Sequence, residues 1–343
     1  MKKLLSLLLI LCLLLPAAAL GEEKLPKVKF SAANYLGYLD TECYIALEIV
    51  NAGSFTGSKT LELHDRYDRL LGIREYKPGQ KLNFRLQFDE TFLGGFDLSV
   101  WCDGKRISTN SAYLAVADRH RKAVVKADTP ENWMSIAIDC SFEDDQTDAI
   151  LDVLAQNGVK ATFFLSGTFV LSFPESAQKI KDAGHEIGSS SWTHPHLLEL
   201  GQDLRFNQVR KGSQIIREKL GVIPRLFMPP YGEFDVTISA PVRAEGMEVV
   251  LWTIDSKDWD KKTADDPDAA FKQATDNVEP GAIVAYHLDG INTAQVLAEV
   301  LPYYQNTLGL TLVTVSDLIA SAGIELPACP YEETRVLITQ NVF

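Results

Sequence analysis

The 343-residue sequence has the composition of an ordinary globular protein, with 46% hydrophobic and 23% charged residues, and its length suits two domains. The formal net charge is −13, and it becomes −15 without residues 1–21, which carry two lysines and no acidic residue. A field of this sign disfavours nucleic acid and anionic lipid as partners, whereas a neutral glycan is indifferent to it.

The N-terminus has the layout of a secretory signal peptide. Lys2 and Lys3 precede an apolar run over residues 4–16, and small residues follow at 17–21. The apolar run is too short to span a bilayer comfortably, and no later stretch is long and apolar enough to do so. We therefore expect a signal peptide over 1–21, a secreted or cell-envelope location, and no membrane span in the mature chain. An uncleaved anchor is the alternative.

Residues 27–117 alternate between short strands and turns. Period-2 patterns mark strands at 43–50, 59–63, 81–88 and 96–102. Turn signals separate these strands, and the pattern predicts a small all-β sandwich of immunoglobulin-like type. No catalytic cluster is visible there, so we expect a spacer or a glycan-contacting module.

Four side chains of this module have two open interpretations. Cys43 and Cys102 share strand parity with core residues, so both thiols should point into one core, either as a disulfide or as two free thiols. Trp101 and Tyr35 suit either core packing or stacking on a sugar.

A charged segment at 118–132 is the expected linker, and from residue 133 strand-like runs alternate with helical ones up to residue 322. A tail follows at 323–343. The expected strands cover 134–140, 161–167, 186–191, 226–230, 249–254, 283–287 and 311–315. The expected helices cover 147–157, 175–183, 208–220, 294–307 and 317–321. Seven strands alternating with helices predict an α/β domain with a parallel sheet, most simply a barrel.

Working residues of such barrels lie at the carboxyl ends of the strands. The candidates there are Asp139, the segment 190–194, the Pro-Pro-Tyr-Gly turn at 229–232, the segment 255–259, and His287. Carboxylates, histidines and a rigid turn at one rim make an active site plausible.

The order and spacing of six motifs resemble the polysaccharide deacetylases, the NodB-like domains of carbohydrate esterase family 4. The motifs are VKATFF at 159–164, GHEIG at 184–188, THP at 193–195, LFMPPYG at 226–232, DSKDW at 255–259 and GAIVAYH at 281–287. The resemblance covers about residues 133–320. It implies a distorted (β/α)7 barrel that hydrolyses N-acetyl groups, and sometimes O-acetyl groups, on a polysaccharide such as peptidoglycan or a chitin-like glycan.

The resemblance also implies roles for individual residues. Asp139 falls at the base, His287 at the acid, and Asp255 at the carboxylate that orients this histidine. The Tyr231 N–H, in the turn with Pro230, matches the oxyanion donor.
Trp259 matches an aromatic wall of the acetyl pocket. The family also implies a divalent metal, most naturally zinc, that polarises the carbonyl and activates water.

Three positions depart from the family pattern. Cys140 stands where a second aspartate is usual, Ser190 where the first of two histidines is usual, and Met228 where an arginine is usual. His194 is then the one family ligand that remains. Asp144 or the neighbouring Asp145, reaching back from the loop, is an alternative oxygen ligand, and Cys140 is an alternative thiolate. His196 is a further substitute, which Pro195 is expected to turn elsewhere.

Rival interpretations stay open for these residues. Asp139 could cap a loop, His287 could be structural, and Cys140 could be a small buried hydrophobe. The leading hypothesis is a secreted polysaccharide deacetylase-like hydrolase. The alternatives are a pseudo-deacetylase that binds glycan or acts as an envelope scaffold, and a metal-free esterase that uses Asp139 and His287.

Overall fold

The computed structural model describes residues 23–331, and the chain divides into two compact units. The expected signal peptide and the last twelve residues of the expected tail lie outside the described residues. No helix within residues 23–331 reaches the length and apolar character that a membrane span requires.

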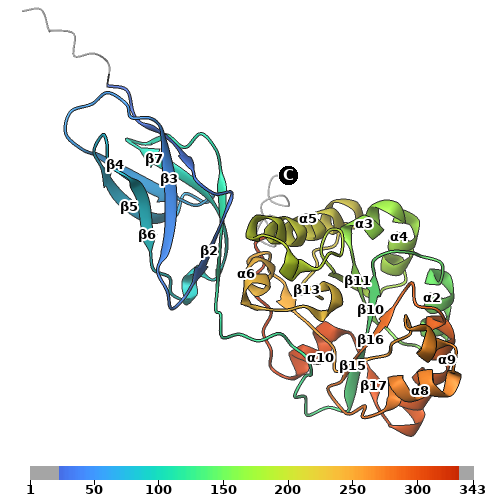
Figure 1. Cartoon of the computed structure of the whole chain (residues 1–343). Coiled ribbons are helices and arrows are strands. Elements are labelled where there is room, and N and C mark those ends of the chain that lie inside the picture. Colours follow the sequence, from blue (N-terminus) through green and yellow to red (C-terminus); the bar gives the residue numbers. More distant parts are fainter. Residues whose placement is uncertain (1–22, 332–343) are drawn as a thin grey trace, which may run out of the picture. The chain divides into compact units, whose positions relative to one another are not determined.

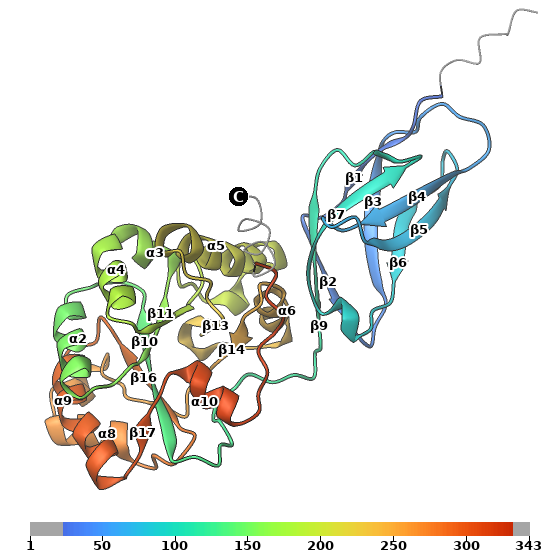
Figure 2. The ribbon, with the colours of Figure 1, turned by 180° about the vertical axis from the view of Figure 1, so that it is seen from behind.

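The N-terminal part is the expected all-β sandwich, coloured blue to teal in Figures 1 and 2. Strands β1, β3 and β6 form one antiparallel sheet, and β2-β9-β7-β4-β5, with β8 beside β7, form the other. The strands are β1 (Lys27–Phe30), β2 (Asn34–Tyr38), β3 (Cys43–Asn51), β4 (Lys59–His64), β5 (Leu70–Tyr76), β6 (Leu82–Leu86), β7 (Gly94–Cys102), β8 (Lys105–Arg106) and β9 (Ala112–Ala117), with a 3-10 turn η1 (Glu90–Phe92) before β7. Strand β5 was not predicted. It buries only Tyr76 and exposes Leu70 and Ile73, so its sequence shows no alternation of apolar and polar residues.

The open questions about this module have clear structural answers. Cys43 and Cys102 are both buried and both free thiols. Tyr35 is a core residue, 8% exposed, whose hydroxyl donates to the Ala46 carbonyl at 2.7 Å. Trp101 is half-buried, and its indole N–H donates to the Ser99 hydroxyl at 2.8 Å.

The second part is the expected α/β barrel. Its parallel strands follow the order β14-β13-β12-β11-β10-β16-β15, and β17 pairs with the start of β10. They are β10 (Trp133–Cys140), β11 (Thr162–Leu165), β12 (Glu186–Ser189), β13 (Leu226–Phe227), β14 (Glu248–Val249), β15 (Ile254–Asp255), β16 (Ile283–His287) and β17 (Thr311–Leu312). The central strand β10 is buried from Met134 to Cys140, as expected for a parallel strand covered on both faces.

One predicted strand is split, and the split explains the distortion of the barrel. The segment expected as a single strand over 249–254 forms β14 at one edge of the sheet and β15 at the other. Val249 pairs with Phe227 of β13, whereas Ile254 pairs with Val284 of β16. The four residues between these strands therefore cross from one edge of the sheet to the other, which leaves an irregular seam in the barrel wall.

Helices surround this sheet (Figures 1 and 2). They are α2 (Thr147–Gln156), α3 (Gly167–Ser172), α4 (Pro174–Asp182), α5 (Gln202–Leu220), α6 (Val236–Ala244), α7 (Lys261–Ala264), α8 (Pro267–Thr275), α9 (Thr293–Pro302) with the π-turn η4 (Tyr303–Thr307), and α10 (Val315–Ser321). Local signals start and stop them: Ser166, Asp235 and Asp266 are N-caps, and Gly221 ends α5 at φ 65°.

Candidate active site

The central feature of the barrel rim is a cavity of about 400 Å³ between the ends of β10 and β16. Asp139 and His287 are register partners on these two strands, so both side chains project to the same face of the sheet. Both line the cavity. The other lining residues are Phe142, His194, Met228, Tyr231, Trp252, Asp255, Trp259, Ala285 and Asp289.

The Asp139 carboxylate is buried and surrounded by donors. Its Oδ2 lies 3.0 Å from Nε2 of His194 and accepts the Ser190 hydroxyl at 3.4 Å, and its Oδ1 accepts the Ser141 hydroxyl. Burial favours the neutral acid, but the charges of His194 and His287 and these hydrogen bonds outweigh burial and lower the pKa of Asp139. Asp139 is therefore a carboxylate over the neutral pH range.

The His287 imidazole is paired with Asp258. Its Nδ1 lies 2.7 Å from Asp258 Oδ1, and its backbone N–H donates to Asp258 Oδ2 at 2.9 Å. Burial opposes the charged ring, but the hydrogen bond and the charge of Asp258, with the charges of Asp139 and Asp255, raise the pKa of His287 to about 9. The ring is thus held as a cation, in the form that can give up a proton.

This pairing corrects the expectation for Asp255. Its Oδ1 accepts the Lys257 N–H at 2.8 Å and the indole N–H of Trp259 at 3.4 Å, so it shapes its own turn. Lys257 has φ 53°, and this reversal brings Asp258 rather than Asp255 onto the histidine. Asp255 still lines the cavity and contributes charge to it.

The loop that carries His194 is held from several sides. Its carbonyls at Ser191 and Trp192 accept the N–H groups of the first residues of α3, at 3.0 and 2.8 Å. Ser191 and His194 have φ of 69° and 53°, a region that costs energy for non-glycine residues. Gly212 of α5 allows close approach, since a Cβ there would collide with the Ser191 carbonyl. His194 is therefore fixed rather than free to swing.

The turn η3 (Pro230–Gly232) forms the opposite rim. Tyr231 has φ 58°, and no acceptor for its backbone N–H is found within residues 23–331. Its ring and that of Trp259 are about half exposed, at 50% and 54%. Pro230 does not line the cavity, contrary to the sequence expectation, because it is buried beneath the turn.

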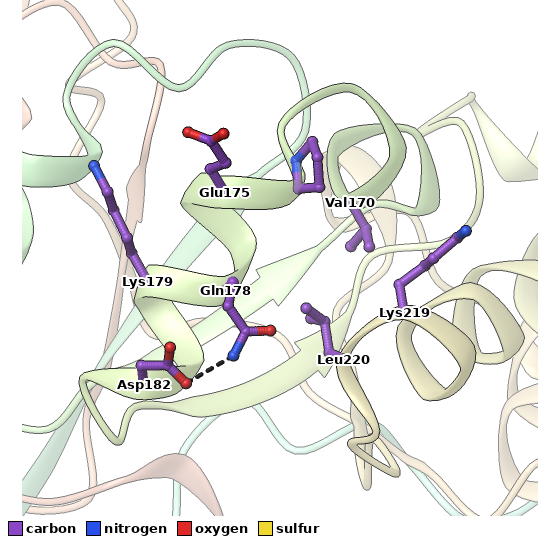
Figure 3. Close-up of a pocket in the computed structure, with 8 residues that line it drawn as sticks. Val170, Glu175, Gln178, Lys179, Asp182, Lys219 and Leu220 are labelled. Carbon is purple, nitrogen blue, oxygen red and sulfur yellow. Dashed lines mark hydrogen bonds between the residues drawn. The ribbon is translucent and has the colours of Figure 1, made fainter.

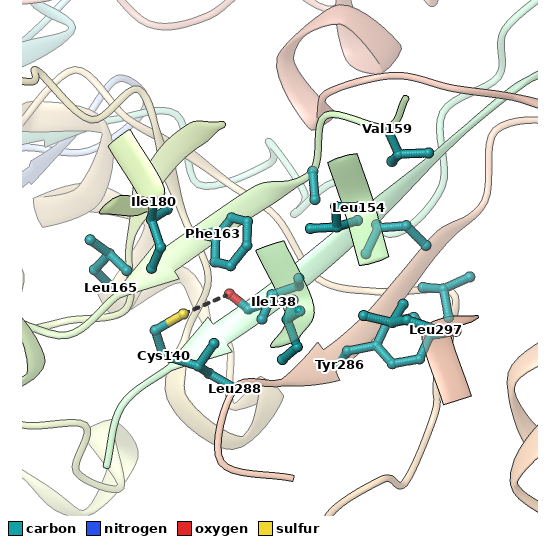
Figure 4. Close-up of a cluster of buried hydrophobic side chains, with 14 of the residues drawn as sticks. Ile138, Cys140, Leu154, Val159, Phe163, Leu165, Ile180, Tyr286, Leu288 and Leu297 are labelled. Carbon is teal, nitrogen blue, oxygen red and sulfur yellow. Dashed lines mark hydrogen bonds between the residues drawn. The ribbon is translucent and has the colours of Figure 1, made fainter. Parts of the chain in front are cut away.

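The two alternative metal ligands are elsewhere. Cys140 points into the hydrophobic core, with its Sγ 3.7 Å from the Ile138 carbonyl, and Figure 4 shows it among Leu165, Ile180 and Leu288. Burial raises its pKa well above the usual value, so it is not a thiolate. Of the two interpretations of Cys140, the small buried hydrophobe is confirmed and the thiolate ligand is wrong. Adjacent residues of a strand face opposite sides, and Asp139 takes the cavity side.

Asp144 lines a different hollow, where its Oδ2 accepts the Ser176 hydroxyl at 2.6 Å. His196 also points elsewhere, as expected, with its Nδ1 2.8 Å from Glu233. Around Asp139 this leaves one carboxylate and one imidazole in direct contact with each other. Between residues 23 and 331 no group of three or more histidine, cysteine or acidic residues could hold a metal. The donor set therefore does not fit a three-ligand metal site.

Several cavity residues were missed by sequence reasoning. Asp289 lies two residues after His287, and burial and the charge of Asp139 raise its pKa. Trp252 lies in the seam between β14 and β15, and Phe142 packs edge-on against His194 with ring centroids 5.2 Å apart. Phe142 and Asp289 each lie two residues after the end of a strand, and this position could have identified them from the sequence.

A second hollow has a comparable volume, about 460 Å³, and lies over α4 and the end of α5 (Figure 3). Its charged side chains are Glu175, Lys179, Asp182 and Lys219, which balance one another. The side-chain amide of Gln178 donates a hydrogen bond from Nε2 to Asp182 Oδ1 at 2.7 Å. This hollow offers no imidazole and no unbalanced charge, so the Asp139 cavity is the candidate active site.

The fold is a distorted α/β barrel with a polar cavity at its rim, and comparison with known proteins shows the family to which this arrangement belongs. The family model described as "Polysaccharide deacetylase" matches residues 126–250. A peptidoglycan-N-acetylglucosamine deacetylase of Bacillus cereus is 30% identical over 203 residues, which cover 56% of this chain and 71% of that protein. The chain belongs to the polysaccharide deacetylase family.

The coverage of other relatives is partial. A peptidoglycan-N-acetylglucosamine deacetylase of Listeria monocytogenes is 28% identical over 221 residues, 62% of this chain, but the match spans about half of that protein (46%). The crystal structure of the Bc1960 peptidoglycan N-acetylglucosamine deacetylase matches with a TM-score of 0.53 and 27% identity over 58% of this chain and 92% of that one.
A family 4 pseudoenzyme from Bacillus anthracis, BA3943, shares the fold, with a TM-score of 0.55 and 22% identity over 68% of this chain and 88% of that one.

Proposed function

We propose that this protein is an exported hydrolase that removes acetyl groups from an N-acetylated envelope glycan such as peptidoglycan. One observation carries the proposal: the Asp139 carboxylate and the His287–Asp258 pair face one cavity from partner positions on adjacent strands. A base and an acid on opposite sides of a bound carbonyl are what hydrolysis of an acetyl group requires. The relatives named as peptidoglycan deacetylases support the choice of substrate.

Each residue has a role in this proposal. Asp139 removes a proton from the attacking water, and His287 protonates the departing group. Asp258 orients His287 and keeps it charged. The N–H of Tyr231, for which no acceptor is found among residues 23–331, donates to the oxygen that becomes negative, and Trp259 forms a wall for the acetyl group.

A second candidate function, glycan binding without hydrolysis, is favoured by the small number of possible metal ligands around Asp139. Deacetylases of this family generally depend on a metal, but Asp139 and His194 lack a third partner in the described part of the chain. An unpolarised amide carbonyl is a poor electrophile, so the same cavity would then serve to bind an acetylated glycan without turning it over. An acetate ester is more labile than an amide, so hydrolysis of such an ester without a metal is the third function to be tested.

Acetate release from purified mature protein tests the proposal. The substrates are N-acetylated chito-oligosaccharide, peptidoglycan and an O-acetylated glycan, each with zinc, cobalt or manganese and each after chelation. The matched controls are Asp139→Asn, which keeps the shape but removes the base, and Asp182→Asn in the hollow of Figure 3.

Acetate formed by wild type and by Asp182→Asn, but not by Asp139→Asn, supports the hydrolase. Saturable binding of the acetylated glycan in calorimetry without acetate supports the binding protein. Activity on the ester alone, unaffected by chelation, supports the metal-free esterase. Neither binding nor turnover with any of these substrates rejects all three.

A further inference from the structure

The proposed chemistry makes no use of His196, yet its side chain makes two directed contacts. The imidazole lies flat on the Tyr231 ring, with ring centroids 4.0 Å apart and planes at 15°. Its Nδ1 lies 2.8 Å from Oε1 of Glu233. Because Tyr231 and Glu233 are two residues apart, a single histidine contacts both sides of the same turn.

The turn that His196 contacts needs external support. Tyr231 has φ 58° and ψ 13°, and Gly232 continues at φ 68°. A tyrosine in the left-handed region is strained, and such conformations persist where surrounding contacts hold them. Burial does not hold this ring, because Tyr231 is 50% exposed.

Glu233, on the other side of the turn, also depends on its contact with His196. Its Oε2 is buried and has no hydrogen-bond partner within residues 23–331, although its Oε1 pairs with His196. A buried carboxylate oxygen without a partner is unfavourable. His196, at Oε1, is the one hydrogen-bond partner found for this carboxylate within residues 23–331, so losing it would leave both oxygens unpaired.

The Tyr231 ring also contacts His194, a residue that lines the cavity. His194 packs its edge on the Tyr231 ring, with centroids 4.9 Å apart and planes at 60°. The Tyr231 ring therefore touches both histidines that flank Pro195. The 194–196 loop and the 230–233 turn are thus joined into one wall of the cavity.

We propose that His196, together with Glu233, is a positioning residue that holds the Tyr231 turn in the shape that receives the acetyl group. This rests on the proposed function, in which an acetylated glycan binds in the Asp139 cavity. His196 acts through Tyr231: it keeps the ring at the cavity wall and the Tyr231 N–H available to the acetyl oxygen.

Three substitutions separate the two contacts. His196→Ala removes both, His196→Phe keeps the stacked ring but loses the bond to Glu233, and His196→Gln keeps a polar group but loses the ring. His64→Ala, in the N-terminal sandwich, is the matched control. All variants are first compared with wild type by circular dichroism, and His196 is exposed, so each should fold.

Calorimetric binding of N-acetylated chito-oligosaccharide is the first measurement. Loss of a stacked aromatic pair predicts an affinity about fivefold to tenfold weaker for His196→Ala. His196→Phe should recover most of the affinity, and His64→Ala should match wild type. The fully deacetylated oligosaccharide should not distinguish these proteins, because it lacks the acetyl group.

Amide hydrogen exchange at Gly232 and Glu233, whose N–H groups donate to the Pro229 and Pro230 carbonyls, is the second measurement, and it needs no ligand. It should speed up in His196→Ala and return toward wild type in His196→Phe. If wild type binds the glycan and His196→Ala binds equally well, the positioning role is wrong. If the wild-type protein does not bind the glycan, the proposed function fails. The positioning role is then judged by hydrogen exchange alone, and exchange rates in His196→Ala equal to those of wild type overturn it.

Discussion

His287 Nδ1 lies 2.7 Å from Asp258 Oδ1, and both oxygens of this carboxylate are used within the site. The other oxygen accepts the His287 N–H at 2.9 Å and the Thr293 hydroxyl at 2.6 Å. Asp258 is almost fully buried. A buried carboxylate bound in this way fixes the ring orientation and stabilises its cationic form.

Replacing Asp258 by asparagine should lower the pKa of His287. The variant keeps the shape but removes the negative charge, so the pKa should fall from about 9 toward its ordinary value of about 6.5. Titration of the His287 ring by NMR measures this directly. In an active enzyme, the alkaline limit of acetate release should move down in pH by the same amount.

Asp255→Asn is the control for this prediction. Asp255 contributes charge but no hydrogen bond to His287, so the pKa of the ring should fall much less. A larger fall in Asp255→Asn than in Asp258→Asn would reverse the assignment of the two carboxylates.

The same pair should make stability depend on pH. The pKa of His287 is higher in the folded chain than in the unfolded chain, so its stabilising contribution is complete below about pH 6.5 and is lost as pH rises through about 9. At about 1.4 kcal/mol per pH unit, the contribution is on the order of 3 kcal/mol. Urea unfolding at pH 6, 8 and 10 should show the gap between wild type and His287→Gln closing with pH; a constant gap would contradict the prediction.

Asp139 and His194 should be energetically coupled. Removing one partner leaves the other buried and unpaired, and such changes cost about 3 kcal/mol. A double-mutant cycle with Asp139→Asn and His194→Gln should therefore give a double variant that is less destabilised than the sum of the singles. Additive free energies of unfolding would show that the 3.0 Å contact carries no coupling.

Chelation should leave the stability of the protein unchanged. A tightly bound metal stabilises the folded state by mass action, but the donor set around Asp139 stops at two residues within the described chain. We expect the melting temperature to be the same before and after dialysis against a chelator, and after zinc is added back. A reversible loss of melting temperature, with one zinc per chain by elemental analysis, would refute this.

Gly212→Ala should destabilise the protein, although alanine is the better helix former by about 1 kcal/mol. The new Cβ would collide with the Ser191 carbonyl, and overpacking costs about 1–3 kcal/mol. The net loss should appear in urea unfolding, together with weaker glycan binding, because the displaced loop carries His194. Gly201→Ala, with open space around the position, is the control: it changes only the N-cap of α5, should cost about 1 kcal/mol or less, and should leave glycan binding unchanged.

The parts of the site that sequence reasoning found are those that barrel geometry dictates. Asp139 and His287 end adjacent strands, so their meeting follows from parallel pairing alone. The choice between Asp255 and Asp258 depends on the left-handed turn at Lys257, which no spacing rule reveals. Cys140 is a buried hydrophobe rather than a ligand, because side-chain alternation along β10, rather than proximity in sequence, decides what faces the cavity.

The fold was predictable for a similar reason. Long periodic segments such as α2 and β10 were found nearly to the residue, because their burial pattern is visible in the sequence. The division of the 249–254 run into two edge strands was not predictable, because five of its six residues are apolar and its partners lie far apart in sequence, at β13 and β16.

The seam between β14 and β15 has a consequence for how the molecule assembles. One end of this segment must dock on β13, which precedes it, and the other on β16, which emerges almost thirty residues later. The ring of strands therefore stays open on a nascent chain until β16 has been made. Trp252 and Asp255, both in this segment and both lining the cavity, reach their final places only at that step, so this wall of the cavity should be among the last parts of the barrel to form.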